Sequence, residues 1–136
     1  MKLLSKDTDY AIRALLHLAQ KDGGWVPSST ISKEEGIPLQ FLRRILLTLK
    51  QNGLIDAKEG VSGGVRLKVS PRKITLAQLV TTFQGEIKIS PCLFRKRLCP
   101  NRSSCVLRKE ILRVEQMLKK QFERINLASL LKEVRK

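Results

Sequence analysis

The residues with the most obvious chemistry are three cysteines, which lie within fourteen positions of one another. Cys92, Cys99 and Cys105 are separated by six and then five residues. Structural zinc sites usually bring cysteines in pairs about two to four residues apart and close with four protein ligands. Iron–sulfur clusters are held by thiolates on irregular loops, so wider spacing suits them. The spacing favours a cluster, and leaves open a zinc site or three reduced cysteines without a ligand.

Basic side chains surround the cysteines and would offset the negative charge of a cluster held by thiolates. They are Arg95, Lys96, Arg97, Arg102, Arg108 and Lys109. The odd number of cysteines argues against a closed disulfide framework. No nucleophile–base pair, phosphate-binding loop or dinucleotide fingerprint is present, so we expect a protein that is not an enzyme.

Other polar residues have simpler interpretations. His17 is the single histidine, and we interpret it as a helix residue satisfied by a neighbour. Asp7 and Asp9, together with Thr8, are interpreted as capping side chains at the start of a helix.

The charge of the chain predicts a polyanionic partner. Its 136 residues contain 27 Lys+Arg and 12 Asp+Glu, for a formal net charge of +15. Hydrophobic residues make up 42%, enough for a core, so this is not the composition of a disordered basic tail. Aromatic residues are only 4%, too few to favour stacking on single strands, so duplex DNA is the expected partner.

The first part of the chain has the pattern of a helix-turn-helix. Apolar residues at three- and four-residue spacings predict helices at about Thr8–Gln20 and Leu39–Asn52. A second cap-rich start at residues 28–30 opens a short helix to about Glu35, and Gly36-Ile37-Pro38 forms the turn before the next helix.

A basic hairpin follows these helices. The strand-like runs Leu54–Lys58 and Val65–Val69 flank a segment with three glycines in six residues. Helices followed by a basic hairpin predict a winged helix. The predicted fold is therefore mainly α, with a small β-hairpin wing and a winged helix-turn-helix domain joined to a long dimerisation helix.

The pattern of the C-terminal part of the chain predicts a dimer. After a helix at Ile74–Phe83 capped by Thr75, residues 86–104 have no period and form a predicted loop. A long helix at about Cys105–Arg124 carries an apolar seam, and a short helix at Leu127–Lys136 closes the chain. The seam residues are Leu107, Ile111, Val114, Leu118 and Ile125. A second copy is expected to cover this seam, although the helix could instead fold back on its own domain.

We therefore predict three parts: a DNA-binding domain at 1–85, a cluster-binding loop at 86–104, and the dimerisation and C-terminal helices at 105–136. Residues at the exposed start of the second helix of the helix-turn-helix are expected to read bases, and cations further along to contact phosphates. The predicted base-reading residues are Gln40, Phe41, Arg43 and Arg44. The expected backbone contacts are Lys50, Lys58 and Arg66, with Gly63 and Gly64 of the wing.

Taken in order, several motifs of this sequence resemble the Rrf2 family of bacterial winged-helix regulators, in particular its iron–sulfur members, the IscR-like and NsrR-like proteins. The resemblance covers essentially the whole chain. It is carried by residues 9–15 (DYAIRAL), Gly36-Ile37-Pro38 with Phe41-Leu42, residues 49–55 (LKQNGLI), Gly60 with Gly63-Gly64, residues 74–76 (ITL) and the three cysteines.

The resemblance implies a homodimeric DNA-binding regulator whose long helices cross in the dimer. Cys92, Cys99 and Cys105 match the cluster ligands, and Gln40, Phe41 and Arg43 fall at base-reading positions. A histidine three residues past the third cysteine is the fourth ligand in some members, but here this position is Arg108, a poor iron ligand. Asp9 matches the aspartate that other members supply from the partner subunit. Where the family's wing often has an arginine before its glycines, this chain has Glu59, preceded by Lys58.

The resulting hypothesis is a cytoplasmic transcription regulator that senses redox state, nitric oxide or iron–sulfur supply through a [2Fe-2S] or [4Fe-4S] cluster. Gain or loss of the cluster is expected to reposition the helix that starts at Cys105. No apolar run approaches the roughly 20 residues that a membrane-spanning helix needs, so no membrane partner is expected. Two alternatives stay open: a cluster-free regulator that responds to a metabolite or partner protein, and a zinc-stabilised or thiol-based interaction module.

Overall fold

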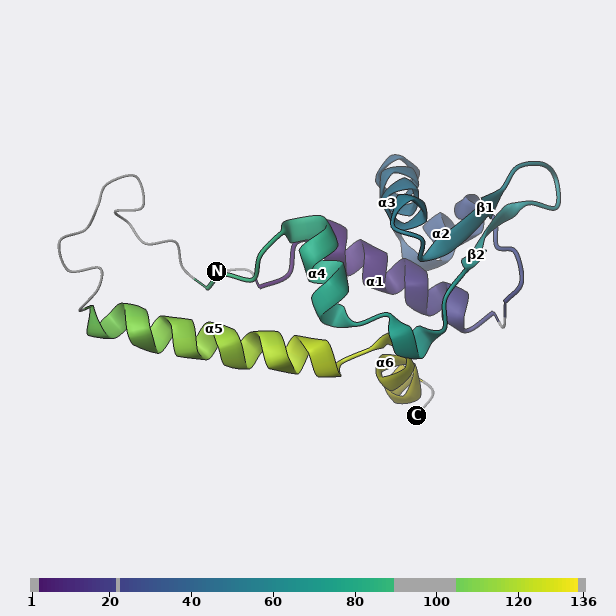
Figure 1. The fold of residues 1–136 in the computed structure, drawn as a ribbon. Helices are drawn as coiled ribbons and strands as arrows, with labels where there is room; N and C mark the ends of the chain where they lie inside the picture. The colour runs from purple at the N-terminus through teal and green to yellow at the C-terminus, as the bar shows by residue number, and fades with distance from the viewer. Residues whose placement is uncertain (1–2, 22, 90–104, 135–136) are drawn as a thin grey trace.

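The computed structural model describes residues 3–21, 23–89 and 105–134, which are mostly helical with one two-stranded antiparallel sheet (Figure 1). Its elements are α1 (Lys6–Ala19), α2 (Ser28–Glu35), α3 (Leu39–Gln51), β1 (Ile55–Lys58), β2 (Gly64–Leu67), the short 3-10 helix η1 (Pro71–Lys73), α4 (Leu76–Gln84), α5 (Val106–Arg124) and α6 (Leu127–Val134). The predicted helices and hairpin are confirmed, with their ends moved by a few residues.

Helix α1 begins earlier than predicted, because its cap is Ser5. The Ser5 hydroxyl accepts a hydrogen bond from the Thr8 backbone N–H at 3.2 Å. The prediction that Asp7, Thr8 and Asp9 cap this helix is therefore wrong. Thr8 is fully buried, whereas Asp7 and Asp9 sit in the first turn, where acidic side chains complement the helix dipole.

The turn between α2 and α3 is closed by local hydrogen bonds. Gly36 ends α2 at a φ of 67°, and the Ser32 hydroxyl donates to the Ile37 carbonyl at 2.6 Å. Residues 28–30 lie inside α2 and do not cap it, since its N-cap residue is Pro27. The Ile37 side chain is buried, and it anchors the turn to the core.

The hairpin is joined to the helices through Val26. In the β1–β2 register, Asp56 pairs with Arg66 and Lys58 with Gly64. Val26 adds two backbone hydrogen bonds to Val65, of 2.9 and 2.8 Å, so the chain before α2 lies against the outer edge of β2. The wing is thereby tied to the helix-turn-helix.

The core is centred on α1, which contacts α2, α3, β2, α4 and α6. Its residues Ala11, Ala14 and Leu15 have no exposed surface. Thr75 caps α4 as predicted, its hydroxyl accepting from the Gln78 N–H at 3.1 Å. Helix α6 also reaches this core, because Leu127 is 1% exposed and its N–H bonds to the Ile74 carbonyl.

Helix α5 lies beside α4 and extends beyond it as a rod (Figure 1). It buries Phe122 and Glu115, while the seam residues Leu107 and Val114 remain 67% and 50% exposed. Met117 is also exposed. The helix therefore packs on its own chain along one side and leaves a second apolar side uncovered.

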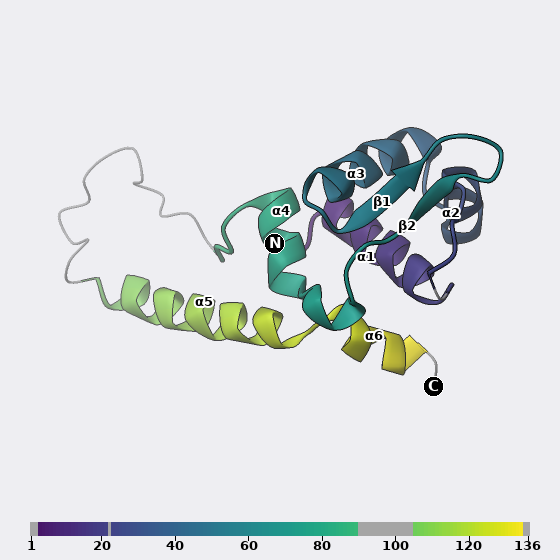
Figure 2. The same cartoon turned by 45° about the vertical axis from the view of Figure 1, so that its right-hand side comes forward.

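The start of α5 and the tip of the hairpin lie at opposite ends of the molecule in both views (Figures 1 and 2). The α4–α1 contact lies between these two ends. Among the described residues, no helix is long and apolar enough to cross a membrane.

Replacing Gly64 with Ala should destabilise the wing strongly. Gly64 has a φ of 145°, and an added Cβ would lie 2.3 Å from the Val26 carbonyl oxygen. The backbone conformation alone costs an alanine about 1–3 kcal/mol, and relief of the overlap must break the Val26–Val65 pairing. Urea unfolding measures the loss. Gly60→Ala is the control, because Gly60 has a φ of 107° with nothing within 4 Å of the added Cβ. An equal effect of both variants would contradict the role of the close approach.

Candidate nucleic-acid interface and metal-ligand residues

Helix α3 separates an apolar face from a polar one. Leu42, Ile45 and Leu49 have at most 1% of their surface exposed, because they pack into the core. The opposite face presents residues that can contact a duplex, and all of them are exposed: Gln40, Phe41, Arg43, Arg44, Leu47 and Lys50. The structure thus brings the predicted base-reading residues onto one accessible surface.

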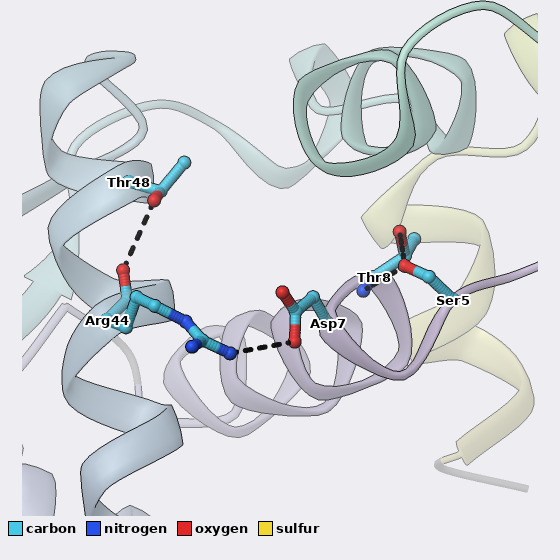
Figure 3. Close-up of polar contacts among 5 residues, drawn as sticks. All are labelled: Ser5, Asp7, Thr8, Arg44 and Thr48. Atoms are coloured by element: carbon cyan, nitrogen blue, oxygen red, sulfur yellow. Dashed lines mark hydrogen bonds and ion pairs between the residues drawn. The ribbon is translucent and has the colours of Figure 1, made fainter.

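Phe41 and Arg44 form a small cluster with the start of α1. The Arg44 guanidinium lies 5.3 Å from the centre of the Phe41 ring, and the Lys6 ammonium lies 6.0 Å from it. An Arg44 N–H also donates to the Asp7 carboxylate at 3.4 Å (Figure 3). These contacts orient Arg44 toward α1, while Arg43 has no such tie among the described contacts.

A polar junction binds the start of α1 to the end of α4. The buried Thr8 hydroxyl donates to Gln84 Oε1 at 2.7 Å, and the Ser5 N–H donates to the same oxygen at 2.8 Å. The Gln84 amide in turn donates to the Leu3 carbonyl. Figure 3 shows Ser5 and Thr8 beside Asp7, in the same first turn of α1. The end of α4 is therefore connected to α3 through the first turn of α1.

The wing carries a second group of cations. Arg66 stacks over Trp25, with its guanidinium carbon 4.3 Å from the ring centre, and the Lys58 ammonium lies 5.9 Å from that centre. Asp56 is 3.9 Å from Arg66 Nε. Gly63 is buried, and an added Cβ would meet the Lys58 carbonyl oxygen at 2.1 Å. Because the backbone comes so close at this position, only glycine fits there, and no contact with DNA is needed to explain the residue.

His17 is held between α1 and α2. It is 5% exposed, and its Nδ1 forms a hydrogen bond of 3.0 Å with Glu35 Oε1. Its Nε2 lies 3.2 Å from a carboxylate oxygen of Glu34, outside hydrogen-bond geometry. The predicted neighbour is therefore found for Nδ1 only, whereas the buried Nε2 has no hydrogen-bond partner among the described residues. The contact with Glu35 joins α1 to α2.

Of the three predicted cysteine ligands, Cys105 lies within the described residues. It is the N-cap of α5, half-buried and not in a disulfide, and its Sγ accepts from the Arg108 backbone N–H at 3.4 Å. This position fits a thiolate ligand, because the N-terminus of a helix favours negative charge. Cys92 and Cys99 lie outside the described residues. Within the described ranges, no group of three or more His, Cys, Asp or Glu side chains could hold a metal ion.

Asp9, the predicted ligand from a partner subunit, is ion-paired within its own helix. Its carboxylate lies 3.0 Å from an Arg13 guanidinium nitrogen, and its side chain is 46% exposed. An exposed pair of this kind contributes only about 0–1 kcal/mol, so it can be broken at little cost.

Glu115 is a functional candidate that the sequence pattern did not single out. It is 8% exposed on α5, and its carboxylate accepts a hydrogen bond from the Ile89 N–H at 2.9 Å. It thus fixes the chain to α5 immediately before the cysteine segment. The sequence pattern also gave no sign that the interface cations have three partners elsewhere in the chain, namely Trp25, Lys6 and Asp7. Only their contacts across the fold identify them, and no local spacing could have done so.

Comparison with known proteins identifies the family. Residues 4–133 match the Rrf2 family, which is described as an iron-dependent transcriptional regulator. The chain belongs to the Rrf2 family. It is 30% identical to the HTH-type transcriptional repressor NsrR of Streptomyces coelicolor over 110 residues, 79% of this chain and 74% of that protein. It is 31% identical to the HTH-type transcriptional regulator IscR of Aliivibrio salmonicida over 107 residues, 78% of this chain and 62% of that protein.

Solved structures share the fold. The structure of T. potens IscR aligns with a TM-score of 0.77 at 23% identity, covering 98% of this chain and 88% of that one. CymR, the global cysteine regulator of B. subtilis, aligns with a TM-score of 0.82 at 21% identity, covering 98% of both chains. The predicted winged-helix fold is confirmed.

The family also confirms the predicted class of function. This Rrf2 protein is a DNA-binding transcriptional regulator, and its matched relatives are regulators rather than enzymes.

Proposed function

We propose that this Rrf2 regulator reads an operator with α3 and the wing, and that it senses redox state, nitric oxide or iron–sulfur supply through a cluster held by Cys92, Cys99 and Cys105. The observation that carries the proposal is the face of α3, which exposes Gln40, Arg43 and Arg44 while its other face is buried. An exposed helix of this kind fits the major groove of a duplex.

Some residues of the proposed interface would contact bases, and others would contact phosphates. Gln40 can pair bidentately with adenine, and Arg43 with guanine, so they supply sequence discrimination. Phe41 offers an apolar edge beside them. Lys50, Lys58 and Arg66 supply affinity through phosphate contacts, which release counterions and do not depend on sequence.

The proposed cluster site is supported by the position of Cys105 at the start of α5. Cys105 sits at a helix N-terminus, and the family's description as iron-dependent agrees with a metal site. When bound, an iron–sulfur cluster would supply redox and ligand-exchange chemistry, because oxidants, nitric oxide and the supply of iron change its charge or break it down. Cys92, Cys99 and Cys105 would hold it, and Asp9 of a partner subunit is the proposed fourth ligand.

A homodimer completes the proposed regulator. The uncovered apolar side of α5 includes Leu107, Val114 and Met117, which are 67%, 50% and 63% exposed. Exposed apolar side chains on one side of a helix are suited to an interface, and twofold pairing of two α5 helices would bury them. The division of the chain into residues 1–85, 86–104 and 105–136 remains part of this proposal, as does its cytoplasmic location. Helix α6 nevertheless packs on the first of these parts.

Two alanine variants test the assignment of base and phosphate contacts. Arg43→Ala should lower the preference for a selected operator over a mismatched duplex by about 1–3 kcal/mol, since it removes a base contact. Lys50→Ala should weaken binding to all duplexes alike and lower the slope of log K against log salt by about 0.9. Operators are selected from a random duplex library, and binding is followed by fluorescence anisotropy. Unchanged discrimination by Arg43→Ala, or binding indifferent to salt, would contradict the assignment.

Replacement of one cysteine tests the cluster. Protein purified without oxygen should contain iron and sulfide and should be brown, whereas Cys99→Ser should take up neither, because two thiolates leave the cluster without its third anchor. Iron and sulfide analysis with an absorption spectrum measures this, and Ser103→Ala in the same segment is the control. Wild-type protein that stays colourless after anaerobic reconstitution would refute the sensor and favour a cluster-free regulator. Stoichiometric zinc without iron would favour a zinc-stabilised module.

A charge placed on the uncovered side of α5 tests the dimer. Val114→Glu should weaken self-association by at least about tenfold, because two carboxylates would be desolvated close to each other. Sedimentation velocity measures the oligomeric state. The control is Gln116→Glu, which adds the same charge about 200° around the helix. A wild-type protein that sediments as a monomer, or a Val114→Glu variant that remains dimeric, would contradict this interface.

A further inference from the structure

Trp25 lies on the outer face of the wing, although it belongs to the segment between α1 and α2. Val26 pairs with Val65, and both of these side chains are buried. Because side chains alternate along extended chain, their neighbours Trp25 and Arg66 share the opposite face. The hairpin register places Asp56 and Lys58 on this face as well. The indole is therefore surrounded by the polar side chains of the wing.

Trp25 is the main constraint on the orientation of Arg66. The guanidinium carbon lies 4.3 Å from the ring centre, within the range of a cation–π contact. The Asp56 carboxylate is 3.9 Å from Arg66 Nε, which is too long for a hydrogen bond. Lys58 Nζ is 5.9 Å from the same ring centre, so one indole faces both wing cations.

We propose that Trp25 is a positioning residue of the DNA interface, which holds Arg66 and Lys58 ready to bind phosphate oxygens. A guanidinium stacked on a ring uses its flat face, and its N–H groups, which lie in the plane, remain available as donors. A long side chain that is already ordered loses less conformational freedom when it binds, so the contact strengthens binding without touching DNA itself. This inference rests on the proposed role of the wing as a phosphate-binding element.

Three substitutions in the full-length chain separate this role from others. Trp25→Leu keeps an apolar side chain and removes the ring, Trp25→Phe keeps a ring, and Arg66→Ala removes the cation. Lys132→Ala on α6 is the control for loss of one charge. The probe is a short mixed-sequence DNA duplex, and Kd is measured by anisotropy across a range of salt concentrations. Urea unfolding shows whether each variant is folded.

Trp25→Leu should weaken binding about two- to tenfold, the effect expected from one side chain that must be ordered on binding. Trp25→Phe should retain most of the affinity. Arg66→Ala should lower the salt slope by about 0.9, as for one lost phosphate contact. If Trp25 acts through Arg66, the double variant should bind only slightly more weakly than Arg66→Ala, through the remaining effect on Lys58.

The outcomes distinguish the inference from the proposed function. If Arg66→Ala weakens binding and Trp25→Leu does not, or if their losses add fully, the positioning role is overturned and the wing contact stands. If Arg66→Ala leaves the salt slope unchanged, the wing contact itself is overturned, and the inference with it.

Fluorescence gives a second test that does not depend on the folding of a Trp25 variant. Trp25 is the single tryptophan of the chain, so all indole emission reports on this site. Addition of the duplex should change the emission of the wild type, and the change should be smaller in Arg66→Ala. If the free Arg66→Ala variant has the same indole emission as the free wild type, Arg66 does not rest on the ring and the proposal is overturned.

Discussion

Burial of the apolar face of α1 is the constraint on which the other parts of this molecule depend. Ala11 and Ala14 have no exposed surface, and their small side chains allow neighbouring elements to come close. Helices α2, α3, α4 and α6 and strand β2 all contact α1. Packing against α1 therefore sets the positions of α3, of the wing through β2, and of α4, which in turn supports α5. Well-packed cores deform little, so these positions are held firmly.

The interface cations are arranged by contacts that cross the fold. Arg44 is oriented by Phe41 and Asp7, and Arg66 by Trp25. Exposed ion pairs and cation–π contacts contribute little to stability, so their consequence is orientation rather than folding. A chain with a net charge of +15 repels itself, and its cations lie mainly at the surface, where water and counterions reduce that repulsion.

The two ends of the molecule are joined by specific contacts. Glu115 fixes the chain before the cysteine segment to α5, which packs on α4. Gln84 at the end of α4 binds Ser5 and Thr8. Asp7 lies between these two residues at the start of α1 and pairs with Arg44 of α3 (Figures 1 and 3). A continuous series of packed and hydrogen-bonded groups thus connects the proposed sensor end with α3, the proposed reading helix.

The helices, the hairpin and the exposed face of α3 were predictable from the amino-acid sequence, because apolar periodicity and glycine placement are local properties that directly predict buried faces and turns. The sequence also predicted three cysteine ligands, which stay a prediction; of these, Cys105 lies within the described residues. Three features became known only from the folded chain: Ser5 rather than Asp7 caps α1, α6 joins the core through Leu127, and Trp25 lies against Arg66. The last two features depend on residues distant in sequence meeting in space, and neither spacing nor composition encodes such meetings. Ser5 and Asp7 are equally good caps by local preference, and the Ser5 N–H is bonded by the distant Gln84.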